Sequence, residues 1–339
     1  MRASSRAAAV IGGGSWGTAL ALHLAQGGFE VPIWVHDPER VQEMISGREN
    51  RTYLPGFKLP ETIHPSADLS QVLRGQTLVV WVVPARFCRD LFRRAAECLD
   101  SSARLVIATK GIEPETGMRM SEVALECLAR PPRALAALAG PGFAREVARG
   151  DPTAGVLGCA DAPQGEKLQE ELTHAAYRFY TNRDLVGVEL GAALKNVIAL
   201  AAGVVEGLGY GSNTTAALIT RGLTEITRLA VACGGSPSTF SGLAGMGDLV
   251  LTCTGSLSRN RSVGVQLGQG KPLADILAGM KMVAEGIPTT SAALFLARRH
   301  SVDLPITTGV EALLSGRISA REALSSLMKR PLKGEDAWG

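Results

Sequence analysis

The stretch AAAVIGGGSWGTALALHLAQ, residues 7–26, decides the fold of the N-terminal half. An apolar run of strand length precedes the glycines, and a helical pattern follows them. Gly12, Gly14 and Gly17 match GxGxxG in this strand–turn–helix context. The first glycine permits a tight turn, the second lets a pyrophosphate approach the backbone, and the third lets the helix pack on the strand. A merely flexible turn would not explain the flanking periodicity, so we expect a dinucleotide site whose phosphates face the helix N-terminus.

The rest of the first half alternates between strand and helix patterns. Residues 78–83, LVVWVV, are continuously apolar, as expected of a strand in a sheet that is covered on both faces. Residues 48–70 are rich in proline and polar residues and predict an irregular connection. The alternation predicts a doubly wound, Rossmann-type parallel sheet over residues 1–183. Its further strands are expected at residues 30–35, 104–109, 134–139, 153–157 and 177–180, and its further helices at residues 86–99, 143–149 and 164–174.

The end of the second predicted strand bears on the choice between NAD and NADP. An acidic residue here would bind a ribose 2′-hydroxyl, whereas a basic residue would favour a 2′-phosphate. His36 takes the strand-end position, Asp37 follows it, and Arg40 comes one turn later. Asp37 has the alternative role of capping the helix that begins at Pro38. The charges conflict, so the preference stays undecided.

Two further strand ends carry candidate ligand-binding residues. Lys110 and Gly111 follow the strand at residues 104–109, where open α/β sheets bind ligands. A solvated loop lysine is the alternative interpretation of Lys110. The strand at residues 134–139 breaks at Gly140-Pro141-Gly142, a second glycine turn that opens onto a helix N-terminus.

After Asn182 the pattern becomes purely helical. Residues 182–205, NRDLVGVELGAALKNVIALAAGVV, predict one long helix whose first turn Asn182 or Asp184 would cap. Side chains lean toward the helix N-terminus, so the Lys195 ammonium would lie over small residues, Gly191 and Ala192. The alternative is that these small residues admit another helix while Lys195 reaches solvent.

The second half is therefore expected to be an all-α domain, residues 184–339. Two stretches interrupt the helical patterns and look irregular. Residues 245–254 place Asp248 in a glycine-rich apolar setting, and residues 258–261 combine Arg259 with hydroxyl and amide side chains, which suits a phosphate. Turn capping by Asp248 and a solvated charge at Arg259 are the alternatives. Helices are expected at residues 213–233, 238–244, 262–269, 272–279, 289–300, 308–315 and 319–328.

Composition excludes several classes of protein. The 339 residues carry a net charge of +3 and only 5% aromatic residues, without a dense basic run, which argues against a nucleic-acid partner. Six scattered cysteines without CxxC predict reduced thiols and no metal site. The N-terminal apolar run is too short for a signal peptide, and we expect no apolar segment approaching the ~20 residues that cross a bilayer. We expect a cytoplasmic protein without a membrane span.

These motifs together resemble a known family. The phrases ATKGIEPETG, LITRGLTE and GLAGMGDLVLTCTGSLSRNR, with the glycine turn and Lys195-Asn196, are similar to bacterial NAD(P)-dependent glycerol-3-phosphate dehydrogenases, from about residue 7 to residue 328. The resemblance implies reversible reduction of dihydroxyacetone phosphate to sn-glycerol 3-phosphate by NAD(P)H. It also implies a role in phospholipid synthesis, an α-helical second domain that binds substrate, and a homodimer.

The resemblance also assigns site residues by matching position. Lys195 would be the general acid/base, supported by Asp248, and burial or nearby Lys110 and Arg259 would lower its pKa. The residues implied to contact substrate are Lys110, Gly140, Lys195, Asn196, Asp248, Ser258, Arg259 and Asn260. Those implied to contact the cofactor, besides Gly12, Gly14 and Gly17, are Ser15, Trp16, His36, Lys110, Ala144, Arg259, Val283 and Glu285.

Two departures and two alternatives qualify this resemblance. Gly142 stands where the family usually has Ser or Thr, and Thr215 stands where it commonly has a basic residue. A β-hydroxyacid dehydrogenase would tend to place an asparagine four residues after the lysine, but that position is Ala199. A nucleotide-sensing regulatory protein without turnover is the alternative from another class. Feedback inhibition and the oligomer formed are not evident from the sequence.

Overall fold

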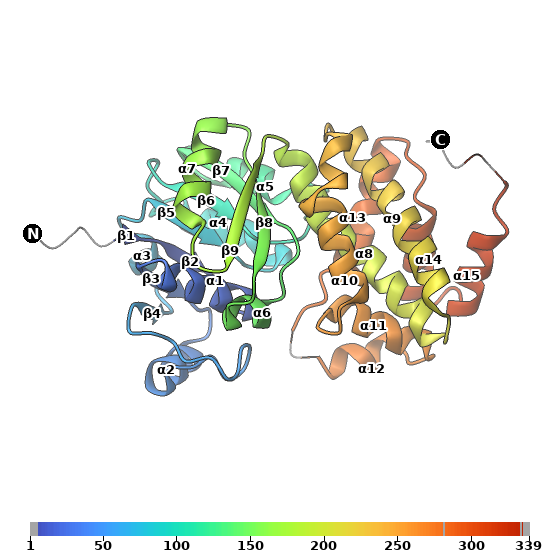
Figure 1. Cartoon of the computed structure of the whole chain (residues 1–339), viewed down its shortest axis with the longest axis horizontal. Coiled ribbons are helices and arrows are strands. Elements are labelled where there is room, and N and C mark those ends of the chain that lie inside the picture. The colour runs from blue at the N-terminus through green and yellow to red at the C-terminus, as the bar shows by residue number, and fades with distance from the viewer. Residues whose placement is uncertain (1–5, 281, 333, 335–339) are drawn as a thin grey trace, which may run out of the picture. The chain divides into compact units, whose positions relative to one another are not determined.

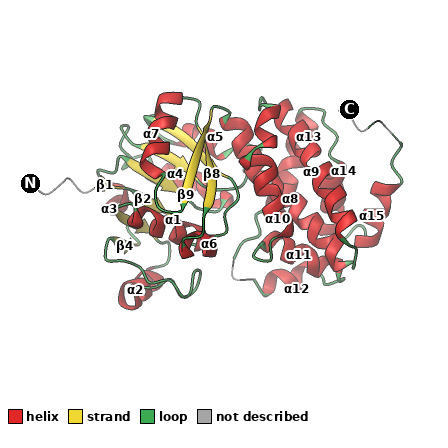
Figure 2. Ribbon diagram, viewed as in Figure 1, coloured by secondary structure: helices red, strands yellow, loops and turns green. Residues whose placement is uncertain are grey.

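Every strand of the computed structural model, which describes residues 6–280, 282–332 and 334, lies in the first of two units (Figure 2). We name them the sheet unit, Met1–Thr109 with Met120–Leu185, and the helical unit, Lys110–Arg119 with Val186–Gly339. Residues 1–5, which belong to the stretch considered above as a signal peptide, lie outside the described residues. Both the expected Rossmann-type sheet and the expected all-α second half are present (Figure 1).

The sheet has nine strands in the order β1-β3-β2-β5-β6-β7-β8-β9, with β4 paired to β3. Neighbouring strands are parallel except β7 and β8, which pair antiparallel. The expectation of a wholly parallel sheet is wrong at this pair. The connection from β7 to β8 contains only the six-residue α6, and a parallel crossover usually needs a longer helix. The strands are β1 Arg6–Ala7, β2 Ala9–Ile11, β3 Phe29–Trp34, β4 Ile63–Ser66, β5 Leu78–Trp81, β6 Arg104–Ile107, β7 Ala134–Ala139, β8 Thr153–Gly158 and β9 Tyr177–Asn182.

Three elements of the sheet unit were not expected from sequence. Strand β4 and the five-residue helix α3 lie within or across residues 48–70, which were predicted irregular. Pro65 cannot donate to a ladder, and β4 accommodates it by pairing with β3 alone. Helix α5 has only eight residues, too few for a clear period. The helices are α1 Ser15–Gln26, α2 Pro38–Gly47, α3 Leu69–Leu73, α4 Cys88–Ala95, α5 Met120–Cys127, α6 Ala144–Arg149 and α7 Ala162–Leu172.

The helical unit is built around α8, which is buried along almost its whole length. Its apolar side chains join those of the surrounding helices in one core cluster. Figure 1 shows α8 among the neighbouring helices of this unit. The helices are α8 Leu185–Gly207, α9 Ser212–Ala232, α10 Asp248–Thr254, α11 Arg259–Gly268, α12 Leu273–Ala278, α13 Gly286–Arg299, α14 Pro305–Leu314 and α15 Ala320–Met328.

The prediction that residues 245–254 and 258–261 are irregular is wrong. A π-helical turn, Leu243–Gly247, leads directly into α10, and Ser258 is the N-cap of α11. Glycine is a poor helix former, which made the first stretch look irregular. Gly245 instead serves packing, because a Cβ there would lie 2.3 Å from Phe240 Cα.

Helices α8 and α11 touch through their backbones. A Cβ on Gly203 would lie 2.0 Å from Arg261 O, and one on Gly264 would lie 2.1 Å from Leu200 O. A real Cβ does not approach a carbonyl oxygen this closely, so both positions require glycine. The contact places the N-terminal half of α11 beside the C-terminal part of α8.

Helix α8 bears on the expectation that no apolar segment is long enough to cross a bilayer. Among the described residues it is the one helix long and apolar enough, by length and composition, to cross a bilayer. The expectation that no apolar segment approaches that length is wrong, because one lysine and two glutamates among 23 residues leave the helix strongly apolar. Burial of 94% of its most apolar 18-residue window identifies α8 as a core helix, and such helices pass the same test.

Candidate functional site

The glycine turn of the sheet unit has the geometry that a dinucleotide site needs. Gly12 has φ +124°, a conformation that side chains disfavour, and a Cβ on Gly17 would lie 1.8 Å from Gly12 O. A Cβ on Gly14 would meet nothing within 4 Å, so the space beside this residue is open. Gly14 is also the N-cap of α1 and makes no side-chain cap, and Ser15 begins the helix. The turn therefore has room for a pyrophosphate at the helix N-terminus.

A second glycine turn follows β7. Gly140 has φ +106°, and Ala144 is the first residue of α6. A Cβ on Gly142 would lie 3.2 Å from the Trp16 ring, closer than an ordinary contact. Glycine at this position thus lets Trp16 approach the turn, which connects the two glycine turns within the sheet unit.

The residues after β3, where the choice between NAD and NADP was considered, include one exposed histidine and one helix cap. His36 is exposed just beyond β3, with its ring 5.9 Å from that of Trp34. Asp37 is the N-cap of α2, and its Oδ1 accepts a hydrogen bond of 3.0 Å from Glu39 N. The capping role of Asp37 is therefore confirmed.

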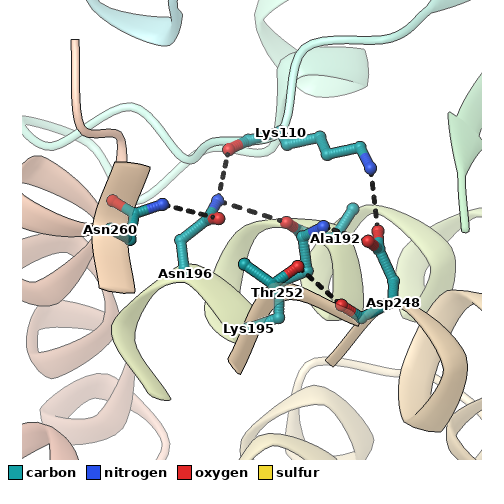
Figure 3. Close-up of polar contacts among 7 residues, drawn as sticks. All are labelled: Lys110, Ala192, Lys195, Asn196, Asp248, Thr252 and Asn260. Atoms are coloured by element: carbon teal, nitrogen blue, oxygen red, sulfur yellow. Dashed lines mark hydrogen bonds and ion pairs between the residues drawn. The ribbon is translucent and has the colours of Figure 1, made fainter. Parts of the chain in front are cut away.

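Two lysines share one buried carboxylate in the helical unit (Figure 3). Asp248, the first residue of α10, is 1% exposed. Its Oδ1 forms an ion pair with Nζ of Lys195 from the middle of α8, and its Oδ2 lies 2.8 Å from Lys110 Nζ. Of the two ammonium groups, that of Lys110 keeps more contact with solvent, since its side chain is 17% exposed and that of Lys195 is 6%.

Burial and charge set the protonation of this cluster. Burial and the nearby Lys110 charge lower the pKa of Lys195 to about 7, against the opposing effect of Asp248. Burial disfavours ionised Asp248, but Lys110 and Lys195 outweigh it and lower its pKa below the ordinary value. Lys195 can therefore give up and regain a proton near neutral pH, which suits a general acid/base.

A short segment of the helical unit delivers Lys110. Residues Lys110–Arg119 belong to this unit although they directly follow β6 in the chain. Ile112 lies in the helical core and forms a β-bridge with Arg119. Arg119 Nη1 donates to Oε2 of Glu189 on α8 at 2.8 Å, and both side chains are largely buried. Sequence reasoning missed this ion pair, which has no local signal.

A chain of amides connects four segments beside the lysines. Asn196 Nδ2 donates to Lys110 O at 3.2 Å and to Ala192 O at 3.4 Å. Asn260 Nδ2 donates to Asn196 Oδ1 at 2.9 Å, and Asn260 Oδ1 accepts from Gly286 N at 3.0 Å. Figure 3 shows Asn196 between Lys110 and Asn260. The amides fix α8, α11 and the start of α13 around the Lys110 backbone.

The remaining candidates of the helical unit lie at two helix starts. Ser258 is buried and caps α11, accepting from Arg261 N at 3.3 Å. Arg259 begins α11 with an exposed side chain; partial desolvation lowers its pKa, and Glu285 opposes this. Glu285 is the N-cap of α13, and Val283 precedes it, half-buried.

Thr215, the second departure from the family pattern, lies in the first turn of α9. Its hydroxyl donates to Gly211 O at 3.5 Å. This bond accounts for the hydroxyl locally and adds no positive charge. Nothing in the structure explains why a basic residue is missing there.

The structure thus gathers Lys110, Lys195, Asn196, Asp248 and Asn260 by direct contacts in the helical unit. Gly12, Gly14, Ser15, Trp16, Gly17, His36, Gly140 and Ala144 lie in the sheet unit. Among the described residues, no group of three or more His, Cys, Asp or Glu side chains could hold a metal ion.

Both units of the chain are similar to known proteins. One matching family model is described as the NAD-dependent glycerol-3-phosphate dehydrogenase N-terminus, over residues 7–164, and another as the C-terminus of the same family, over residues 184–325. The matched residues include every candidate named above, from Gly12 to Glu285.

Named relatives and a solved structure agree with these models. A protein named glycerol-3-phosphate dehydrogenase, NAD(P)+, from Citrifermentans bemidjiense is 52% identical, with 96% of this chain and 98% of the relative covered. One of the same name from Geobacter sp. strain M21 is 53% identical, with the same coverage. The crystal structure of a glycerol-3-phosphate dehydrogenase from Coxiella burnetii matches with a TM-score of 0.92 and 38% identity, over 96% of this chain and 99% of that one.

Proposed function

This chain belongs to the NAD-dependent glycerol-3-phosphate dehydrogenase family, and we propose on that premise that it reversibly reduces dihydroxyacetone phosphate to sn-glycerol 3-phosphate with NAD(P)H. The observation that carries the proposal is the Lys195–Asp248–Lys110 cluster. In this cluster the Lys195 ammonium has a pKa of about 7, and Lys110 adds a second positive charge beside it. A carbonyl reduction needs both features, because negative charge develops on the carbonyl oxygen.

The sheet unit has the features to hold the dinucleotide. We assign this role to residues 1–183, because the open space beside Gly14 and the uncapped start of α1 suit a pyrophosphate. Bound NAD(P)H supplies the hydride for the substrate carbonyl carbon. The residues we assign to cofactor contact are Gly12, Gly14, Ser15, Trp16, Gly17, His36, Lys110, Ala144, Arg259, Val283 and Glu285.

Lys195 is the general acid in the reducing direction. As hydride reaches the C2 carbon of the substrate, the Lys195 ammonium donates a proton to the forming alkoxide and becomes a neutral amine. In the reverse direction the neutral amine takes this proton from the alcohol. Asp248 orients the ammonium, and Lys110 adds the second positive charge that favours deprotonation of Lys195.

The substrate phosphate needs positive charge and hydrogen-bond donors. Arg259 provides a planar guanidinium fork at the N-terminus of α11, next to Ser258 and Asn260. The residues we assign to substrate contact are Lys110, Gly140, Lys195, Asn196, Asp248, Ser258, Arg259 and Asn260. All of them except Lys110 and Gly140 lie within residues 184–339, and we assign substrate binding and catalysis to that range.

The test is a direct assay of the purified protein. Adding dihydroxyacetone phosphate to the protein with NADH or NADPH should oxidise the cofactor and yield sn-glycerol 3-phosphate, identified by mass and by chiral analysis. Cofactor binding without oxidation would instead favour the nucleotide-sensing alternative. Oxidation of NAD(P)H by 3-keto acids, or reduction of NAD(P)+ by 3-hydroxyacids, without any reaction of the ketone phosphate would favour a β-hydroxyacid dehydrogenase.

The biological setting follows from the same family membership. We propose a cytoplasmic homodimer that supplies glycerol 3-phosphate for phospholipid synthesis. Reduced thiols at Cys98, Cys159 and Cys253, none in a disulfide within the described chain, are compatible with that compartment. Light scattering after size-exclusion chromatography would measure the oligomer, and a monomeric mass would contradict the dimer.

A further inference from the structure

The end of β3 carries a cation whose role in the proposed reaction is not assigned. We propose that Arg40 binds the 2′-phosphate of NADPH and thereby makes this protein prefer NADPH to NADH, an inference that rests on the proposed function. Three observations in the sheet unit support this proposal: the capping role of Asp37, the incomplete hydrogen bonding of Arg40, and the attachment of Tyr53, on which Arg40 stacks, to the glycine turn.

The carboxylate of Asp37 is engaged in capping α2. In NAD-binding Rossmann domains, an acidic side chain at the end of the second strand accepts hydrogen bonds from the ribose hydroxyls. Here Asp37 Oδ1 accepts from Glu39 N at 3.0 Å, and Oδ2 faces Arg40 Nη2 at 3.4 Å. The strand-end position itself holds His36, which is no carboxylate. No carboxylate therefore occupies the strand-end position itself, and the nearest one, Asp37, serves as the cap of α2.

Arg40 is held in place while its hydrogen bonding stays incomplete. Its guanidinium carbon lies 4.5 Å from the centre of the Tyr53 ring, a stacking geometry that restricts the side chain. The side chain is 22% exposed. Among the residues that the structure describes, no atom accepts a hydrogen bond from Arg40 Nη1, which is itself buried. A guanidinium in this state gains from a ligand with several acceptor oxygens, and a phosphate is such a ligand.

The Arg40–Tyr53 stack is attached to the glycine turn. Tyr53 N donates to Asn50 Oδ1 at 3.2 Å. Asn50 Nδ2 in turn donates to Gly13 O and to Thr18 Oγ1, each at 2.8 Å, and Asn50 is fully buried. These bonds fix the position of the stack relative to the turn that we assign to the pyrophosphate. The adenosine ribose is covalently attached to that pyrophosphate, so its 2′-substituent must lie near the end of β3.

The negative charge of Asp37 does not oppose this assignment strongly. Its bond to Glu39 N and its position at the N-terminus of α2 stabilise the carboxylate without Arg40. The Arg40–Asp37 pair is long, at 3.4 Å, and the Asp37 side chain is 42% exposed, so the pair is weak and exchangeable. Arg40 can therefore turn its fork to a 2′-phosphate while Asp37 keeps its capping bond.

The decisive experiment compares kcat/KM for NADPH and NADH in three proteins. The unsubstituted protein should prefer NADPH. Arg40→Ala should lower kcat/KM for NADPH by about 10- to 100-fold, the value of a charge-assisted bidentate contact, and change that for NADH by less than about twofold. Arg178→Ala is the matched control, since Arg178 stacks on Tyr180 at 5.3 Å in the same unit, and both ratios should stay unchanged.

Several outcomes would overturn the proposal. They are a preference for NADH in the unsubstituted protein, an equal loss for both cofactors in Arg40→Ala, or an equal loss in the control. Arg40→Lys keeps the charge but loses the fork, so it should fold if Arg40→Ala does not. It should retain an intermediate preference, and an undiminished preference would contradict bidentate binding.

Binding without turnover separates this proposal from the proposed function. Calorimetric titration of the unsubstituted protein should show tighter binding of 2′,5′-ADP than of 5′-ADP, and Arg40→Ala should abolish the difference. If that result appears but dihydroxyacetone phosphate is not reduced, the proposed function fails and the Arg40 site stands. If reduction occurs but the two nucleotides bind equally in both proteins, the Arg40 site fails and the function stands.

Discussion

Lys110 Nζ lies 2.8 Å from Asp248 Oδ2, although 138 residues separate the two in the chain. The same carboxylate pairs through Oδ1 with Lys195. The buried Asp248 carboxylate thus pairs with two ammonium groups, and the cluster has a net positive charge when both lysines are protonated. Burial of the Lys195 ammonium, together with the nearby Lys110 charge, lowers its pKa to about 7 against the opposing effect of Asp248.

Replacing Lys195 tests its place in the proposed reaction. Lys195→Ala should lower kcat by about 10²–10⁴, the usual loss when a general acid/base is removed. Steady-state kinetics with dihydroxyacetone phosphate measures the effect. Lys271→Ala, which removes an exposed lysine of the same unit, is the control and should keep normal turnover. Near-normal kcat in Lys195→Ala would remove Lys195 from the mechanism.

The pH dependence should differ in sign between the two directions. Ketone reduction requires protonated Lys195, so kcat/KM should fall as the pH rises through about 7. Alcohol oxidation requires the neutral amine, so kcat/KM should fall as the pH drops through the same value. Rates over pH 5–9 in both directions measure the two profiles. Parallel profiles in both directions would contradict a single titrating group.

Arg259 should affect substrate affinity more than turnover. Because its fork is assigned to the substrate phosphate, Arg259→Ala should raise KM for dihydroxyacetone phosphate by about 10-fold or more. Arg261→Ala is the matched control two residues away, where the guanidinium already pairs with Glu206 at 2.5 Å. An unchanged KM in Arg259→Ala, or an equal rise in the control, would count against the assignment.

The backbone contact between α8 and α11 makes a stability prediction. In Gly264→Ala the new methyl would lie 2.1 Å from Leu200 O, and relief of that clash requires the helices to separate. The substitution should lower the free energy of unfolding by about 2 kcal/mol or more. Gly309→Ala on α14 is the control, because a Cβ there meets nothing within 4 Å. Chemical denaturation of both variants measures the effect; equal stability would show that the contact tolerates a methyl.

The stability of the folded protein should decrease in acid because of His23 in the sheet unit. This side chain is 4% exposed and stacks on His174 at 3.8 Å, and its Nε2 donates to Leu172 O at 2.8 Å. Burial, followed by the His174 charge, lowers the pKa of His23 from 6.5 to about 4. The folded protein therefore binds the proton less readily than the unfolded chain does. The stabilisation is present above pH 6.5 and is lost as the pH falls through about 4.

The pKa difference at His23 between the folded and unfolded states corresponds to a decrease in the free energy of unfolding on the order of 3 kcal/mol at acidic pH. Unfolding midpoints between pH 4 and 7 measure it, and His23→Phe, which cannot titrate, should reduce the slope. An identical slope in His23→Phe and the unsubstituted protein would contradict this source of acid sensitivity.

Local chemistry explains which features could be predicted from the residues alone. The glycine turn before α1, the alternation of strands and helices, and the long helix around Lys195 all depend on neighbours within one or two turns of chain. Asp37 capped α2 as its residue type allows. Matching motifs across both halves then identified the family, because such joint matches are specific where a single glycine motif is weak.

Features that depend on packing between distant segments could not be predicted this way. Gly245 and Gly247 suggested irregular chain, but contact with Phe240 gives Gly245 a packing role in a helical turn. The antiparallel pairing of β7 with β8 is likewise a matter of which strands pair, which the alternation of strand and helix patterns does not determine.

The residue types at the candidate site were evident in the sequence, including Lys195, Asp248 and Asn260. Tertiary structure alone decided that Lys110 belongs with the helical unit, that it shares Asp248 with Lys195, and that Asn196 connects it to Asn260. The physical reason is that turns and helix caps are determined over a few residues, whereas a pKa depends on which charges burial brings together across the whole chain.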